Sequence, residues 1–81
     1  MTKAEAKEFL INNCTKIINQ YENSLAPIKE ELEYWNHQLE KAENDQEKRR
    51  ISGIIWGYQE KYDDLQNTIN LNKALIAFIE D

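Results

Sequence analysis

The sequence predicts an all-helical protein in which two long helices fold back on each other as an antiparallel, coiled-coil-like hairpin. Only two glycines and one proline occur in 81 residues, and charged residues make up 31%, a composition that favours helix over strand or loop. Apolar residues recur at alternating gaps of four and three in two stretches, as in helices that pack along a narrow apolar line. The two lines are out of phase, so the chain must reverse between them.

The first stretch predicts a helix over about residues 3–42. Pro27 complicates it, because a proline inside a helix removes one hydrogen bond and costs about 3 kcal/mol. Asn23 and Ser24, just before it, are good capping residues. We therefore expect a helix that is kinked at Pro27, or one that is broken near 23–27, which would give a three-helix bundle instead. The apolar line, here called the first seam, consists of Cys14, Ile18, Tyr21, Leu25, Ile28, Leu32, Trp35, Leu39 and Ala42.

The second stretch predicts a helix over about residues 46–80, after a reversal at 43–46 in which Asp45 caps the helix. Folding back there pairs the seams from Ala42 with Ile51 to Cys14 with Ile79. Asn72 then lies opposite Tyr21, and we expect a hydrogen bond between them that fixes the register. The second seam consists of Ile51, Ile55, Tyr58, Tyr62, Leu65, Ile69, Asn72, Ile76 and Ile79.

Several apolar residues lie off the seams near both ends of the chain, which the hairpin brings together at its open end. A chain of this size builds a modest core that supplies about 3 to 5 kcal/mol. A cluster of exposed apolar residues usually marks an interface. We therefore expect two copies to dimerise into a helical bundle. The residues expected to mediate this self-association are Phe9, Leu10, Ile17, Leu71, Leu75 and Phe78.

The formal net charge of −5 argues against direct binding to nucleic acid, which usually requires a basic surface. No stretch approaches the roughly 20 apolar residues that span a bilayer, and residues 1–8 do not read as a secretory signal. We therefore expect a cytoplasmic protein that binds no membrane. Cys14, the single cysteine, is expected to be a reduced thiol.

The sequence offers no arrangement of residues for catalysis, for a cofactor or for a metal ion. His37 is the only histidine, and Glu33 one turn before it would supply just a second ligand. Cys14 has no histidine positioned to activate it and is interpreted as a small core residue. We therefore predict that the chain is not an enzyme.

The most unusual local feature is the segment 52–57, Ser-Gly-Ile-Ile-Trp-Gly. Gly53 and Gly57 lie one helical turn apart and leave a strip without side chains, at a cost of about 1 kcal/mol each relative to alanine. Trp56 lies off the seam and is a candidate anchor for a partner protein. Alternatively, the strip admits a neighbouring helix of the same chain. The predicted partner-binding residues are Trp56, Gly53, Gly57, Lys48, Arg49 and Arg50.

We predict a non-enzymatic regulator or inhibitor that docks on a larger protein, of a size and composition that would suit a phage or mobile element. One alternative is a structural coiled-coil module that oligomerises or tethers. Another is an acidic mimic of nucleic acid that inhibits a DNA-binding enzyme, since carboxylates cluster along the chain. Neutralising Glu30 and Glu31 together with Asp63 and Asp64 would test the mimic.

Overall fold

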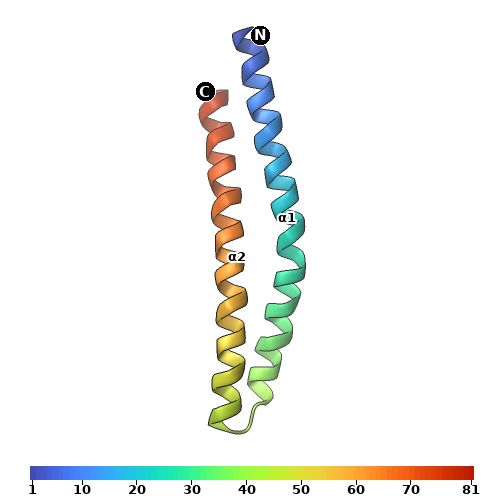
Figure 1. The fold of residues 1–81 in the computed structure, drawn as a ribbon, viewed down its shortest axis with the longest axis vertical. Coiled ribbons are helices and arrows are strands. Elements are labelled where there is room, and N and C mark those ends of the chain that lie inside the picture. Colours follow the sequence, from blue (N-terminus) through green and yellow to red (C-terminus); the bar gives the residue numbers. More distant parts are fainter.

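Two long antiparallel helices make up the protein, and no strand occurs. The computed structural model describes all 81 residues, with α1 at Lys3–Lys41 and α2 at Asp45–Glu80. The two helices lie side by side, and the molecule is a rod with extents of 64 × 16 × 15 Å (Figure 1). The predicted helical hairpin is confirmed, with element bounds that differ from the expected ones by one residue.

Both helices begin with a side-chain cap. Thr2 and Glu5 form a capping box at the start of α1, in which each side chain accepts a hydrogen bond from the backbone N–H of the other residue. At the start of α2, Oδ1 of Asn44 accepts from the N–H of Glu47 at 2.8 Å. The prediction that Asp45 caps this helix is therefore wrong. Asp45 is the first helical residue, where its negative charge interacts favourably with the positive end of the helix dipole.

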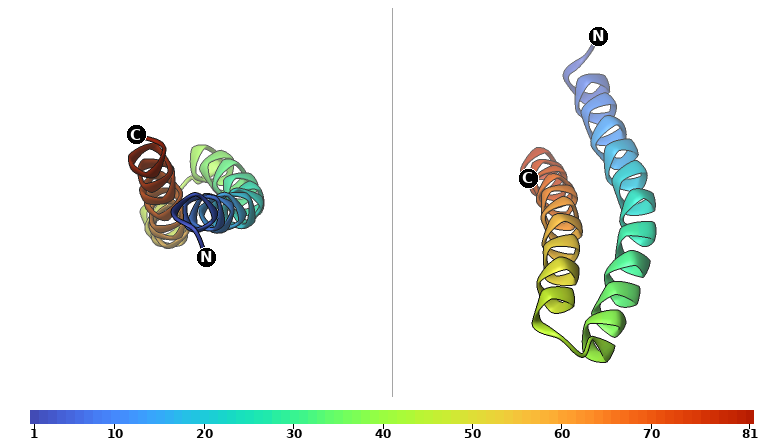
Figure 2. Two further views of the ribbon diagram at one scale, coloured as in Figure 1. Left: turned by 90° about the horizontal axis from the view of Figure 1, so that it is seen from above. Right: turned by 60° about the horizontal axis from the view of Figure 1, so that its bottom comes forward.

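Pro27 lies inside α1 and does not end it. The helix continues from Lys3 to Lys41, and Figure 2 shows it curving without interruption. The alternative of a break near 23–27 and a three-helix bundle is therefore wrong. Pro27 and Asn23 are both exposed, so water can satisfy the Asn23 carbonyl that loses its intrahelical partner.

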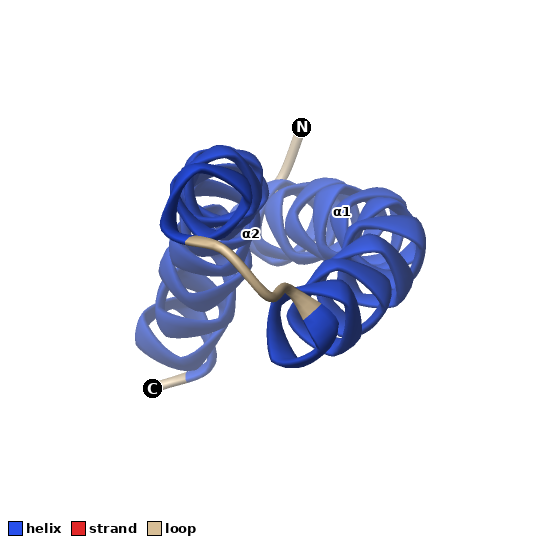
Figure 3. Cartoon of the chain, turned by 90° about the horizontal axis from the view of Figure 1, so that it is seen from below, coloured by secondary structure: helices blue, strands red, loops and turns tan.

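The core is a single line of contact between the two seams. All eighteen predicted seam residues are buried or half-buried. No third element packs against the pair, as Figure 3 shows from the turn end. Most of each helix therefore faces outward. The buried apolar residues are Cys14, Ile18, Leu32, Ile51 and Ile69.

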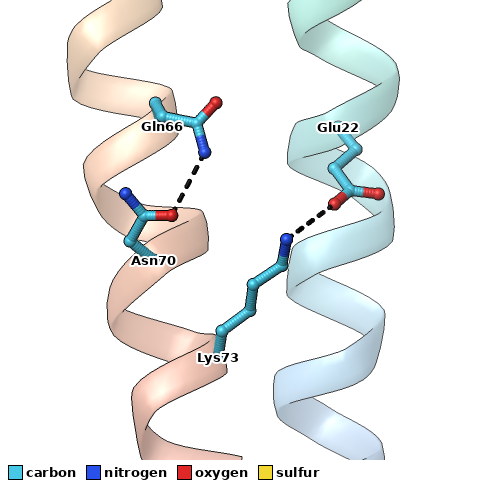
Figure 4. A network of polar contacts seen from close by, with 4 residues as sticks. All are labelled: Glu22, Gln66, Asn70 and Lys73. Carbon is cyan, nitrogen blue, oxygen red and sulfur yellow. Dashed lines mark hydrogen bonds and ion pairs between the residues drawn. The ribbon is translucent and has the colours of Figure 1, made fainter.

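An ion pair between the helices supports the predicted register. Nζ of Lys73 lies 3.6 Å from a carboxylate oxygen of Glu22 (Figure 4). These residues directly follow Asn72 and Tyr21, which the register places opposite each other. Both side chains are about half exposed, so the pair contributes little stability, of the order of 0 to 1 kcal/mol.

Asn72 is buried, as its seam position predicts, but its hydrogen bond is not the expected one. Its Nδ2 donates to the backbone carbonyl of Thr68, one turn earlier in α2, at 2.8 Å. No hydrogen bond joins Asn72 to Tyr21, so that part of the prediction is wrong. The carbonyl of the preceding turn lies within reach of the amide and competes successfully with a hydroxyl on the other helix.

Candidate protein-binding surface

The hairpin has two distinct flanks, which the Glu22–Lys73 pair identifies. Chain neighbours of a seam residue lie about 100° to either side of it around the helix. Glu22 and Lys73 each follow a seam residue, and their contact shows that such residues of both helices share one flank. We call this side the ion-pair flank. Residues that directly precede a seam residue share the other side, which we call the opposite flank.

Trp56 directly follows the seam residue Ile55, so it belongs to the ion-pair flank of α2. Trp56 is 69% exposed, although tryptophan has the largest side chain of any residue in the protein. Nothing in the chain covers it, and no hydrogen bond of its indole N–H occurs within the chain, whereas Trp35 donates to Glu31 at 3.2 Å. Trp56 thus offers both an apolar ring and a free donor to a partner.

Gly53 and Gly57 leave open space on the outward side of α2. A Cβ atom built on either glycine would meet no heavy atom within 4 Å. Neither glycine has a positive φ, so neither is needed for backbone conformation. The alternative that the strip admits α1 is therefore wrong. At 3.6 residues per turn, Trp56 and the two glycines all lie on the side of α2 that faces away from its seam.

The basic cluster Lys48, Arg49 and Arg50 forms the first turns of α2, at the turn end of the hairpin. All three residues are exposed, and none makes an ion pair within the chain. Arg49 precedes Trp56 by seven residues, which places it two turns away along the same side of the helix, about 10 Å along the axis. Three unpaired cations and one exposed indole thus lie along one stretch of α2.

A shallow open hollow lies beside this cluster. Asn44, Gln46, Glu47 and Arg50 line it, and none of them is hydrophobic. Small-molecule sites are usually concave and mainly apolar, with a few polar groups. This hollow has the opposite character, so it adds polar contacts to a surface and does not resemble a ligand pocket.

The apolar residues predicted for self-association lie at the open end, and most of them share the opposite flank. Leu71, Leu75 and Phe78 directly precede the seam residues Asn72, Ile76 and Ile79, and all three are exposed. On α1, half-buried Ile17 directly precedes the seam residue Ile18, and exposed Leu10 lies seven residues before Ile17, on the same side of the helix. Phe9 is exposed next to them, on the outward side of α1. Trp56 lies on the other flank, and all of the predicted partner-binding residues, at 48–57, lie nearer the turn, so the two surfaces are separate.

The remaining residues considered for chemistry lie apart from one another. Cys14 is buried in the seam as a free thiol. His37 is on the surface, with Nδ1 4.0 Å from Glu40. No group of three or more potential metal ligands occurs. Neither helix combines the length and the apolarity that crossing a membrane requires.

Tyr34 is an exposed aromatic residue that the sequence analysis did not single out. Its ring contacts Trp35 edge to face, with centroids 5.0 Å apart, and more than half of the side chain is accessible. The signal was present in the sequence, because Tyr34 directly precedes a seam residue and so cannot lie in the seam. It belongs to the opposite flank and provides a control position for experiments on Trp56.

Comparison with protein families, with curated proteins and with solved structures finds no match to this chain. Its function is therefore inferred from the surfaces described above.

Proposed function

We propose that this chain is a cytoplasmic, non-enzymatic regulator or inhibitor that docks on a larger protein through the outward side of α2. The docking surface consists of Trp56, Gly53, Gly57, Lys48, Arg49 and Arg50. Tryptophan and arginine are the residues that most often dominate binding energy at protein interfaces. The partner surface would be concave at the indole and acidic near the arginines.

The observation that carries the proposal is the exposure of Trp56 beside an unfilled glycine strip. Keeping Gly53 and Gly57 in a helix costs about 1 kcal/mol each relative to alanine, and no internal contact offsets that cost. A flat strip next to a bulky ring lets a partner backbone approach closely while the ring enters a pocket. Both features are useful to a binding surface and costly to a free hairpin.

The unpaired cations support the same surface. Lys48, Arg49 and Arg50 stay solvated in the free chain, so an acidic partner does not have to compete with internal carboxylates for them. Charges at the rim of an interface mainly accelerate association and select partners. Binding should therefore weaken as salt concentration rises.

Quantitative affinity capture from host lysate tests the proposal with three variants. We expect the native chain to capture one stoichiometric partner, and Trp56→Ala to weaken the binding of that partner by about thirtyfold or more, the loss typical of an anchor residue. Arg49→Ala should weaken it less, and Tyr34→Ala, an exposed aromatic on the opposite flank, should leave it unchanged. Circular dichroism of each variant checks that the hairpin is intact.

Two outcomes would contradict this proposal. A chain that recovers only itself would be a structural tethering module. Equal loss of binding in Trp56→Ala and Tyr34→Ala would mean that the surface lies elsewhere.

A nucleic-acid mimic is the second candidate, favoured by the distribution of charge. Residues 22–64 hold eleven acidic and six basic residues and so carry the whole net charge of −5. The carboxylates at Glu30, Glu31, Asp63 and Asp64 are all exposed, and the register brings these two pairs to the same level of the hairpin. If the quadruple change to Gln and Asn abolishes partner binding while Trp56→Ala does not, mimicry replaces the leading proposal.

A further inference from the structure

The opposite flank at the open end carries an apolar surface that the hairpin itself does not cover. We call it the open-end patch and define it as Leu10, Ile17, Leu71, Leu75 and Phe78. Leu71, Leu75 and Phe78 follow one another at spacings of four and three, so they form one continuous stripe along α2. Phe78 is 79% exposed and Leu75 42%. The patch adjoins the half-buried seam residues Ile76 and Ile79 and thus extends the core to the surface.

The charge around the open-end patch indicates what covers it. The register places Ile28 opposite Leu65, so residues 1–28 and 65–81 make up the open end, and they contain five acidic and four basic side chains. Their formal net charge is −1, whereas residues 29–64, with ten acidic and six basic side chains, carry −4. Between Leu65 and Ile79 the only charged residue is Lys73, and it is paired with Glu22 on the other flank. The open-end patch contains no charged residue. It therefore does not attract a charged partner electrostatically and does not repel the same patch of a second copy.

The core consists of a single line of contact between two helices, which favours association with a second molecule. Only six of 81 residues are buried, five of them apolar. Small helical proteins with so little internal burial are commonly stabilised by association. An interface of standard size buries about 800 Å² on each partner, about an eighth of the 6305 Å² surface of this chain.

We propose that the open-end patch binds the same patch of a second copy, related by a two-fold axis, with the two turns at opposite ends of the dimer. This proposal concerns a surface separate from the Trp56 surface and does not depend on the proposed function. The two-fold relation follows because a patch that meets itself forms a closed interface. The opposed turns follow because the alternative would place two turn-end segments, each with a net charge of −4, beside each other, within the screening length of about 8 Å.

In this arrangement the four helices overlap only over their open-end halves, where they form a short four-helix bundle. Leu75 lies in the middle of the α2 stripe and is expected at the centre of the interface. Trp56 and the glycine strip remain accessible on both copies. A dimer of this form therefore presents two docking surfaces far apart on one elongated particle.

Light scattering coupled to size-exclusion chromatography tests self-association on the full chain. We expect a mass of twice the 9.6 kDa of one chain. Leu75→Glu buries an unpaired charge in the interface and should weaken the dimer by about a hundredfold or more. Phe78→Glu is a second variant with a similar expected effect at a more exposed position. Trp56→Glu, on the ion-pair flank, is the matched control and should remain dimeric.

Small-angle X-ray scattering tests the orientation of the two copies. If the 17 residues 65–81, about 25 Å of helix at 1.5 Å per residue, overlap between copies, the longest dimension should be about 100 Å. A longest dimension close to the 64 Å of one hairpin would overturn the opposed arrangement.

Three results would overturn the proposal of a dimer at this patch. The native chain could have the mass of a monomer at millimolar concentration. Both glutamate variants could remain dimeric while circular dichroism shows them folded. Trp56→Glu could dissociate the dimer, which would place the contact on the other flank. Loss of partner capture in Trp56→Ala with the dimer intact would bear on the proposed function alone.

Discussion

Asn72 is the one polar residue among the six buried residues, and its amide donates a hydrogen bond within its own helix. A buried amide with a single hydrogen bond loses more hydration than it regains. We therefore predict that Asn72→Leu stabilises the hairpin by about 1 kcal/mol or more, since leucine suits this seam position. Urea denaturation followed by circular dichroism measures it. Asn72→Ala is the control and should destabilise, because it removes the amide without filling its space. A loss of stability in Asn72→Leu would show that the amide stabilises the fold.

Substitutions of Gly53 and Gly57 should change the stability of the hairpin and its binding to a partner in opposite directions. Alanine at either position meets open space, so each change should stabilise the helix by about 0.5 to 1 kcal/mol. The same methyl groups would obstruct a partner that approaches the strip closely. We expect the double variant to melt at a higher temperature and to bind the partner more weakly. Unchanged binding would mean that the glycines do not contribute to the docking surface.

At the scale of the element, the cap of α2 can be assigned by experiment. Asn44 accepts the hydrogen bond from Glu47, whereas Asp45 contributes only its charge in the first turn. Asn44→Ala should therefore destabilise the protein by about 1 kcal/mol, and Asp45→Ala by about 0.3 to 0.5 kcal/mol. Thermal and urea unfolding of both variants measure the difference. A larger loss of stability in Asp45→Ala than in Asn44→Ala would mean that Asp45 is the capping residue.

Pro27 offers a second test at this scale. It is exposed, lies off the seam and interrupts the hydrogen bonding of α1. Pro27→Ala restores the missing N–H and relieves the contact with the preceding turn, so we expect stabilisation of about 1 to 3 kcal/mol. Ser24→Ala, one turn earlier on the same helix, is the control and should change stability only slightly. No gain in Pro27→Ala would mean that the proline favours the shape of α1 that packs against α2.

The elements also show how far the sequence determines this fold. The alternation of gaps identifies every seam residue, because burial along a helix pair depends only on periodicity. The register follows from the position of the turn. The hydrogen-bond partner of Asn72 and the continuity of α1 through Pro27 cannot be predicted from this periodicity. Each depends on which of several nearby groups satisfies a polar atom. Thr68 outcompetes Tyr21 for the amide, and water replaces the missing donor at Asn23.

The candidate surface was predictable in part. The sequence identifies Trp56 and the two glycines as unusual, since they interrupt a helix off the seam. The predicted seam already places both glycines off the side of α2 that contacts α1, and the structure adds that no heavy atom lies within 4 Å of a Cβ atom built on either one. The unpaired state of Arg49 and Arg50 also depends on side-chain geometry, since Glu43, Asp45 and Glu47 lie close in sequence.

At the scale of the whole molecule, one line of contact holds the hairpin together, and Ile69 is its most buried residue at 0% exposure. Ile69→Ala should cost about 2 to 5 kcal/mol through lost burial and the cavity that remains. A core of this size supplies a net of about 3 to 5 kcal/mol. The variant should therefore be largely unfolded at room temperature, with most of its helical circular dichroism lost. Trp56→Ala removes a larger side chain from an exposed position and should remain helical.

The contrast between these two variants tests whether the seam alone stabilises the fold. Isolated helices longer than about 15 residues retain some helicity in water, so a partial signal in Ile69→Ala would not by itself indicate a folded hairpin. Cooperativity in urea distinguishes the cases, since a packed pair unfolds in a sharp transition and separate helices lose signal gradually. A sharp transition in Ile69→Ala at nearly the native midpoint would mean that contacts outside the seam hold the two helices together.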